Sequence, residues 1–220
     1  MLKIARADGV GCIAATPHFM EGVCENTSGR IKEALAELEN YADGIKLCPG
    51  ADVRICRNIV ERIRAGEVQS INGGNHVLVE MPDFVLPPID SLAQIFEEMK
   101  AAGYTPVVTH PERHPAIARD FTEILNRLRA AGAIIQITAQ SLTGHFGKGA
   151  QKTSMAMLKK GLAHVAASDA HGPDRQKRPP ILSEAYNLVK KKFGADHADM
   201  LFITNPERVV YGWEVQDLGD

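Results

Sequence analysis

The sequence has few cysteines, no surplus of positive charge and no long apolar run, and each shortage argues against a class of protein. Its four cysteines include no C-x-x-C pair, so neither a thiolate zinc site nor a two-cysteine redox motif is indicated. Cys12 and Cys48 fall within apolar runs, and we expect both side chains to be buried. This cysteine usage suits a reducing cytoplasm.

Charge and hydropathy restrict the partners. The formal net charge is −2, so no excess of basic residues is present to bind a nucleic-acid backbone. No stretch approaches the roughly 20 apolar residues of a membrane span, and the first residues do not have the pattern of a signal peptide. At 220 residues, 45% of them apolar, the chain is long enough for one sizeable core. We therefore expect one cytoplasmic domain over residues 1–220.

Short apolar runs alternate with longer segments of helical spacing, which is the βαβα pattern of a parallel sheet. The candidate strands are 12–16, 45–48, 76–79, 105–109, 133–138 and 164–167. The candidate helices are 30–41, 58–65, 90–102, 121–131, 151–160, 182–193 and about 206–211. Parallel strands with no switch point in their order favour an α/β barrel over a flat, doubly wound sheet.

The start of the chain resembles the last turns of a helix. Leu2, Ile4 and Ala5 are followed by Asp8-Gly9 and then by the first candidate strand. A helix end with neither a cap nor a preceding strand predicts that the first strand of the barrel is missing. The strand at 12–16 would then have an unpaired edge, and such edges favour association into a homo-oligomer or local disorder.

Side chains that can bind metal follow five of the six candidate strands. The carboxyl ends of barrel strands meet at one mouth, so these side chains should converge there. They are His18, Asp52, Glu80, His110, Asp169 and His171. This mixed nitrogen and oxygen set suits manganese, iron or zinc. Because carboxylates can bridge two ions, and such ions activate water and polarise phosphoryl oxygens, we predict a multi-metal phosphoester hydrolase.

Each of these residues also has an ordinary interpretation. A single histidine after a strand is more often hydrogen-bonded within the fold than bound to a metal. Asp52 or Glu80 alone could be a helix cap or a solvated loop carboxylate. The two-residue spacing of Asp169 and His171, and the recurrence of ligands at successive strand ends, favour the metal site.

The remaining histidines are not assigned to the site. His76 and His164 stand at strand starts, where barrel residues serve stability, and His197 lies in a charged helical stretch. His114 and His145 lie in loops beside the candidate ligands and stay undecided.

Three arginines could bind a phosphate group. Arg113 follows His110 by three residues and so reaches the same mouth, where its planar guanidinium could hold two phosphate oxygens. Arg175 and Arg178 follow His171, and either could bind phosphate or form surface ion pairs.

Six sequence runs, taken together, identify a family. They are ATPHF, PGADVRI, LVEMP, THPERH, ITAQSLTGHFGKGAQK and VAASDAHGPDR. In this order and spacing, from about Ala5 to Gly194, the chain resembles the bacterial manganese-dependent protein-tyrosine phosphatases of capsular and exopolysaccharide synthesis. These enzymes belong to the polymerase and histidinol phosphatase (PHP) superfamily.

The resemblance implies a distorted (β/α)7 barrel with a cluster of three metal ions that dephosphorylates a partner tyrosine kinase. His18 and His171 would share one ion, and Glu80 and His110 would hold a second together with Asp52. A third would be held by Asp52 and Asp169. Phosphate would be bound by Arg113 and by Arg175 or Arg178.

Two departures from the family pattern set the alternatives. The chain lacks the Asp-x-His-x-His strand with which the family opens, so one ion would lose half of its protein ligands. Asp52 stands where the family usually has a bridging glutamate, which is one methylene longer. The alternatives are a small-molecule phosphatase of the histidinol-phosphate type, and a binding protein that recognises phosphate without turnover.

Overall fold

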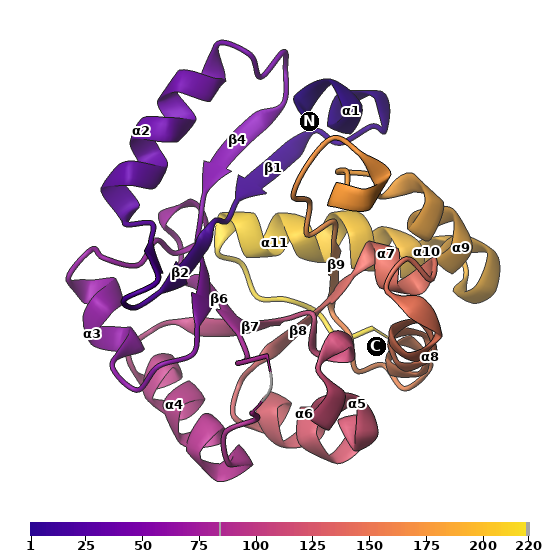
Figure 1. Cartoon of the computed structure of the whole chain (residues 1–220). Helices are drawn as coiled ribbons and strands as arrows, with labels where there is room; N and C mark the ends of the chain where they lie inside the picture. The colour runs from indigo at the N-terminus through magenta and orange to yellow at the C-terminus, as the bar shows by residue number, and fades with distance from the viewer. Residues whose placement is uncertain (84, 219–220) are drawn as a thin grey trace.

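A parallel β-sheet lies in the middle of the molecule and most helices surround it (Figure 1). The computed structural model describes residues 1–83 and 85–218, apart from the side chain of Arg175. Its main sheet has the order β3-β2-β5-β6-β7-β8-β9, and a second sheet pairs β1 with β4. All pairings are parallel except that of β3 with β2. The strands are β1 (Cys12–Ala15), β2 (His18–Met20), β3 (Cys24–Glu25), β4 (Lys46–Pro49), β5 (Asp52–Arg54), β6 (His76–Glu80), β7 (Thr105–Thr109), β8 (Ile134–Thr138) and β9 (Val165–Ala167).

The first two predicted strands each continue through a kink into a second strand. β1 runs on into β2 past Thr16-Pro17, and β4 runs on into β5 past Gly50. The two kinks touch, because a Cβ on Gly50 would lie 2.6 Å from Ile71 Cδ1 and 2.9 Å from Thr16 Cγ2. A residue without a side chain is therefore required where the two kinks lie side by side.

Alternation along the strands separates two apolar layers. Val77 and Val79 of β6 pack in the large cluster beneath the helices, whereas Leu78 between them belongs to a smaller inner cluster. The inner cluster consists of Ile71, Leu78, Val107, Ile134, Val165 and Val209. Since side chains alternate with period two, Glu80 faces the same inner side as Leu78, and Thr109 the same side as Val107.

The helices cover the outside of the strands. Figure 1 shows α2, α3, α4, α6 and α8 around the rim, while α11 passes behind the strands. Val209 of α11 contributes to the inner cluster and so closes it on that side. The helices are α1 (Leu2–Ala7), α2 (Ser28–Glu39), α3 (Ile59–Arg64), α4 (Ile89–Ala101), α5 (Pro115–Arg119), α6 (Phe121–Ala130), α7 (Ala139–Leu142), α8 (Gly147–Lys159), α9 (Ser183–Phe193), α10 (Ala195–Asp199) and α11 (Asn205–Tyr211).

The expected α/β class and parallel sheet are confirmed, and most predicted helices agree with the structure to within two residues. The helix expected at 151–160 is wrong at its start, because α8 begins four residues earlier at Gly147. The short elements β2, β5, α5 and α7 were not predicted. In the part of the chain that the structure describes, no helix is both long and apolar enough to cross a membrane.

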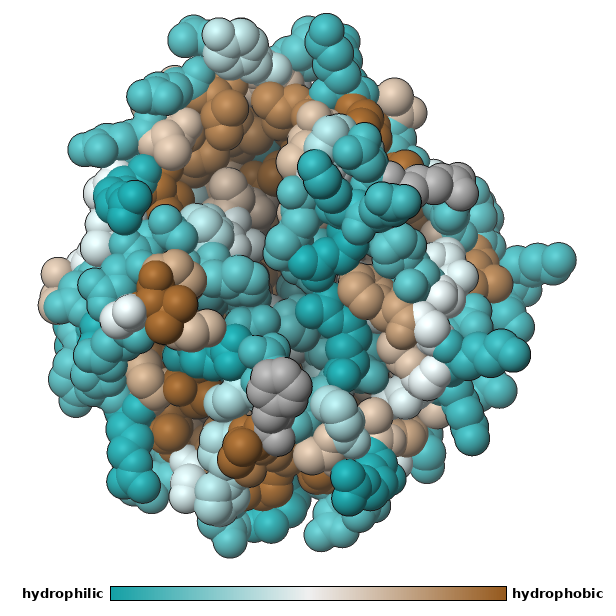
Figure 2. Space-filling model, viewed as in Figure 1, coloured by the Kyte–Doolittle hydropathy of each residue, from teal (hydrophilic) through white to brown (hydrophobic). Residues whose placement is uncertain are grey.

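A hollow of about 1910 Å³ lies on the inner side of the sheet. It extends from Asp52 and His110 at the strand ends to Ile71 and Val209 at the opposite end. Figure 2 shows apolar residues lining a depression in the upper part of the view, over β1 and β4. Among the described residues, no strand pairing joins β1 to β9. The candidate ligands therefore stand at one end of an open, largely apolar hollow.

Candidate metal centre

Three neighbouring strands bring the first candidate ligands together. His18 is the first residue of β2, Asp52 the first of β5 and Glu80 the last of β6. His18 lies opposite Asp52 in the β2–β5 pairing, and Glu80 lies opposite Arg54 in the β5–β6 pairing. His18 follows β1 and Asp52 follows β4 within three residues, as expected, but each also begins a further short strand that was not predicted.

The three ligand atoms form a compact group. One donor atom each from His18, Asp52 and Glu80 lie within 4.8 Å of one another. Nδ1 of His18 is 3.6 Å from Asp52 Oδ2 and 3.5 Å from Glu80 Oε2. Asp52 and Glu80 are both buried, so two carboxylates lie close together away from the outer surface.

His110 completes the group from the other side. Its Nε2 is 3.3 Å from Glu80 Oε1 and 3.9 Å from Asp52 Oδ2. The residue has a left-handed backbone conformation (φ +37°) just after β7, which is uncommon outside glycine and accumulates at functional sites. The side chains of His110 and Asp169 are each only 12% exposed.

Burial and charge shift the pKa values of this group in different directions. Burial, opposed by the charge of His110, raises the pKa of Asp52 to about 6. Glu80 is buried too, but its close contact with His110 and the charges of His18 and Arg54 lower its pKa. Burial alone would lower the pKa of His110, and the contact with Glu80 raises it instead. The group therefore behaves as one electrostatic unit.

The chemistry of this group fits a cation. In the described part of the chain, His18 Nδ1 and His110 Nε2 are buried without a hydrogen-bond partner. Buried polar atoms are normally paired, and an orphaned ring nitrogen beside a buried carboxylate is what a metal ligand presents. Two imidazoles and two carboxylates match the ligand preferences of manganese, iron or zinc.

Asp169 lies between two arginines and the ligand group. Its Oδ2 accepts hydrogen bonds from Nη1 of both Arg113 and Arg178. His171 lies beside His18, with ring centroids 5.9 Å apart, and its Nδ1 contacts the carbonyl of Asp169. Asp169 Oδ1 also lies 3.7 Å from Nδ1 of His171. All six predicted ligands thus have side chains close to another member of the set, and Asp169 also binds the two arginines. Arg178 therefore lies beside the candidate ligands. The side chain of Arg175, the other candidate for binding phosphate, lies outside the described residues.

Sequence reasoning missed three polar residues that support the site. Thr109 donates a hydrogen bond to Asp52 Oδ1 at 3.2 Å. Arg54 Nη2 lies 3.3 Å from Glu80 Oε2. Glu112 is fully buried and accepts hydrogen bonds from Ser141 Oγ and the Thr138 amide. Period-two alternation could have placed Thr109 on the inner face, but nothing in the sequence signals that Glu112 is buried.

The undecided and structural histidines have defined roles in the fold. His114 caps α5 by accepting from the Ile117 amide, and its Nε2 contacts the Pro82 carbonyl, so it is structural. His164 accepts from the Ile135 amide and contacts Asp217, as a structural role predicts. His76 is also buried. His145 is exposed and lies edge-on to Phe146.

Burial makes two of the cysteines poor candidates for a nucleophile. Cys24, Cys48 and Cys56 each precede an arginine by six positions, a spacing also used by cysteine-dependent phosphatases. Cys48 is fully buried in β4, and burial raises the pKa of Cys56, which disfavours a reactive thiolate. The expectation that Cys12 is buried is wrong, because the residue is exposed at the start of β1.

Comparison with known proteins gives one family and several close relatives. The family described as "Capsular polysaccharide synthesis, CpsB/CapC" matches residues 1–211. CapC of Staphylococcus aureus is 37% identical over 196 residues, covering 87% of this chain and 75% of CapC. The tyrosine-protein phosphatase YwqE of Bacillus subtilis is 33% identical over 205 residues, covering 91% of this chain and 79% of YwqE.

A solved structure agrees with these sequence relatives. It comes from the crystal structures of YwqE from Bacillus subtilis and CpsB from Streptococcus pneumoniae, which are metal-dependent tyrosine phosphatases. It superposes with a TM-score of 0.89 at 30% identity, covering 99% of this chain and 87% of the other. The similarity therefore extends over the whole sheet and its surrounding helices.

Proposed function

Because the chain belongs to the CpsB/CapC family of capsular polysaccharide synthesis, we propose that it is a metal-dependent protein-tyrosine phosphatase. Its substrate is phosphotyrosine on a bacterial tyrosine kinase of capsule or exopolysaccharide synthesis, and it acts in the cytoplasm. The observation that carries this proposal is the convergence of His18, Asp52, Glu80 and His110 on one group, with two arginines beside it.

The proposed metal is manganese, in two or three ions. His18, Asp52, Glu80 and His110 would hold the first ion or pair of ions, and the ring of His171 is close enough to His18 to contribute to a neighbouring one. Asp169 would contribute through the oxygen that does not accept from the arginines. Bound ions of this kind activate water and stabilise charge on a phosphoryl oxygen.

The arginines supply the phosphate-binding half of the site. Asp169 accepts one hydrogen bond from each of Arg113 and Arg178, and each guanidinium has five N–H donors. The Asp169 carboxylate thus aims both cations at the same mouth, where they would bind the phosphate oxygens and stabilise the negative charge that develops during transfer. Arg54 holds Glu80 in place from the opposite side.

The experiment compares substrates and metal content in one preparation. We expect manganese-dependent hydrolysis of a phosphotyrosine peptide, with much weaker turnover of histidinol phosphate. Glu80→Gln should lose most of the bound manganese, as measured by elemental analysis, and lower kcat/KM by at least about a hundredfold. The matched control is Glu97→Gln on the exposed face of α4, which should change neither quantity.

The other outcomes separate the alternatives. Faster turnover of histidinol phosphate would indicate a small-molecule phosphatase. Phosphate binding without turnover of either substrate, at full manganese content, would indicate the binding protein. A Glu80→Gln variant with unchanged metal content would remove Glu80 from the ligand set.

A further inference from the structure

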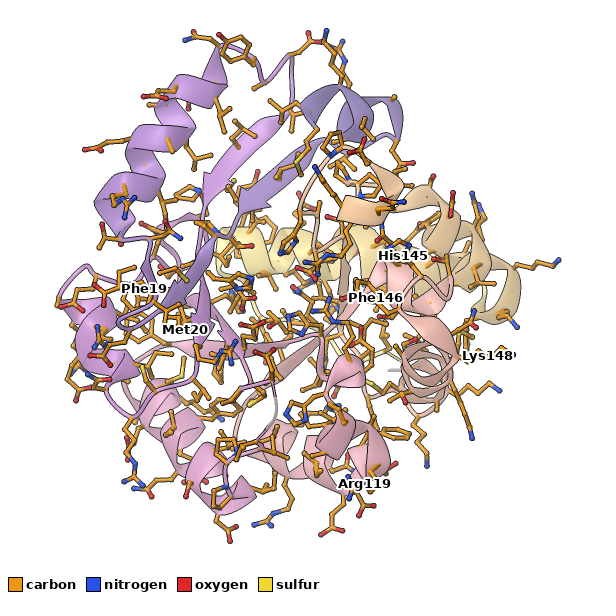
Figure 3. The ribbon with its side chains drawn as sticks, in the orientation of Figure 1. Phe19, Met20, Arg119, His145, Phe146 and Lys148 are labelled. Carbon is orange, nitrogen blue, oxygen red and sulfur yellow. The ribbon has the colours of Figure 1, made fainter. Side chains whose placement is uncertain are left out.

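One aromatic ring covers both arginines of the candidate phosphate site. The ring of Phe146 lies 4.6 Å from Cζ of Arg113 and 5.7 Å from Cζ of Arg178. The two arginines come from different segments, after β7 and after β9, and both contact Asp169 and this ring. Figure 3 shows Phe146 near the centre of the view, whereas Lys148 of α8 lies toward the periphery.

The loop that carries Phe146 is held by short-range contacts. It connects α7 to α8, and two glycines have left-handed conformations, Gly144 (φ +89°) within the loop and Gly147 (φ +84°) at the first position of α8. The amide of His145 donates to the Gln140 carbonyl, and that of Gly147 to the Gly144 carbonyl. The His145 ring packs edge-on against Phe146, with centroids 5.4 Å apart at 77°. The aromatic ring is therefore positioned before any ligand arrives, and it remains partly exposed.

A phosphate bound by the two guanidinium groups places its ester substituent beside Phe146. In a phosphotyrosine the aryl ring is joined to the phosphate through a single oxygen, so a phosphate at the arginines brings that ring next to the Phe146 ring. Aromatic pairs stabilise each other in offset or edge-on arrangements, with centroids about 4.5–7 Å apart. An alkyl substituent of a phosphoserine or a small metabolite gains no such contact.

We infer that Phe146 is a specificity-determining residue that selects aryl over alkyl phosphomonoesters by packing against the aryl ring. The inference rests on the proposed function, because it takes the two arginines as the phosphate site. It also distinguishes two roles for the same ring. A ring that only braces the arginines affects every phosphate ligand equally, whereas a ring that contacts the substrate affects aryl ligands selectively.

Ligand binding tests the inference without turnover. The probes are phenylphosphonate and methylphosphonate, which share the phosphonate group and differ in the ring, titrated by calorimetry into the manganese-loaded protein. We expect the wild type to bind phenylphosphonate more tightly by about two- to tenfold. Phe146→Leu keeps an apolar side chain of similar size and should abolish that preference, with methylphosphonate affinity changed less than about twofold. Phe146→Trp should retain the preference.

Turnover gives a second readout and a control. On a phosphotyrosine peptide, Phe146→Leu should raise KM by about two- to tenfold and leave kcat nearly unchanged. Phe193→Leu on α9 removes an aromatic ring outside the site and should alter neither binding nor KM.

Two results would overturn the inference. One is a phenylphosphonate preference that survives in Phe146→Leu, and the other is an equal loss of affinity for both probes. If the ring preference depends on Phe146 but the wild type hydrolyses no phosphomonoester, the inference stands and the proposed function fails. If hydrolysis is robust but the preference does not depend on Phe146, the proposed function stands and the inference fails.

Discussion

Single carboxylates in the site each contact several side chains from different strands and loops. Glu80 at the end of β6 contacts His18 of β2, Arg54 of β5 and His110 after β7. One carboxylate thus links side chains from three other strands or strand ends. Asp169 does the same for two arginines. In a buried, weakly screened environment each such contact fixes its neighbours, and removing one member leaves the others as uncompensated charges. Substitution effects within this group should therefore be far from additive.

Glu112 is a buried carboxyl group whose hydrogen bonds hold the start of α7 rather than a candidate metal ligand. Substituting it tests how much these hydrogen bonds stabilise the fold. Its Oε1 accepts from Ser141 Oγ at 2.6 Å and from the Thr138 amide at 3.0 Å, and burial raises its pKa. Glu112→Ala would leave both donors buried without an acceptor, at a cost of about 2–5 kcal/mol in the free energy of unfolding. Glu112→Gln keeps an acceptor oxygen and should cost much less.

Urea denaturation of the two variants measures this difference. Because α7 begins at these donors and leads to the loop of Phe146, Glu112→Ala should also weaken phosphotyrosine turnover. Equal stability of the Ala and Gln variants would show that the two hydrogen bonds contribute nothing to the fold.

At the level of elements, the kinks between β1 and β2 and between β4 and β5 position the first ligands. Each kink turns the strand so that its second half joins the main sheet, with His18 and Asp52 as the first paired residues. A straight strand over 12–20 or 46–54 would carry the same residues away from Glu80. The kinks are thus part of the site, although they contain none of its ligands.

Gly50→Ala tests that dependence. The added methyl group would lie within 3 Å of Ile71 Cδ1 and Thr16 Cγ2, and overpacking of this kind costs about 1–3 kcal/mol. We expect a lower melting temperature and weaker manganese binding, since Asp52 is two residues away. Ile71→Val removes the Cδ1 atom, so the double variant should regain part of the melting temperature and of the manganese binding. Alone, Ile71→Val costs about 0.5–1.5 kcal/mol in the free energy of unfolding. Strictly additive effects in the double-mutant cycle would contradict the proposed contact.

The sequence predicted the elements better than their ends. Short apolar runs located β1, β4, β6, β7, β8 and β9, and helical spacing located the longer helices, because both faces of a parallel sheet and one face of each helix are buried. This pattern could not reveal β2 or β5, because each continues a strand that a kink interrupts and begins with a candidate ligand rather than an apolar residue. The start of α8 was placed too late because Gly147 and Gly149 resemble a loop by propensity, and tertiary packing overrides that preference.

The candidate site was predictable in its residue types but not in its contacts. Ligands after successive strands indicated convergence, and the structure brings His18, Asp52, Glu80 and His110 together. Nothing in the sequence indicated that Asp169 would face Arg113 and Arg178, or that a ring from another loop would cover them. Such contacts join residues far apart in the chain, so local pattern carries no information about them.

For the molecule as a whole, the two ends of the strands have opposite electrostatic character. The carboxyl ends hold the charged group, whereas the amino ends bury His76 at the start of β6 and His164 just before β9, the latter in contact with Asp217. Burial lowers the pKa of His76 to about 4 and also lowers that of His164. Both side chains are therefore neutral in the fold at neutral pH, and the fold resists their protonation.

This burial predicts how the free energy of unfolding depends on pH. Between the folded pKa of His76, about 4, and its unfolded value of 6.5, the unfolded chain binds a proton that the folded protein does not. Stability from this residue is therefore complete above pH 6.5 and falls as the pH decreases toward 4, by about 3 kcal/mol in total. His76→Gln should flatten that slope relative to the wild type, in urea titrations at several pH values with a chelator present. Because the metal-site carboxylates titrate in both proteins, their contribution cancels in the difference, and His145→Gln controls for the loss of an exposed histidine. A slope that is the same in the wild type and in His76→Gln would show that folding does not lower the pKa of His76.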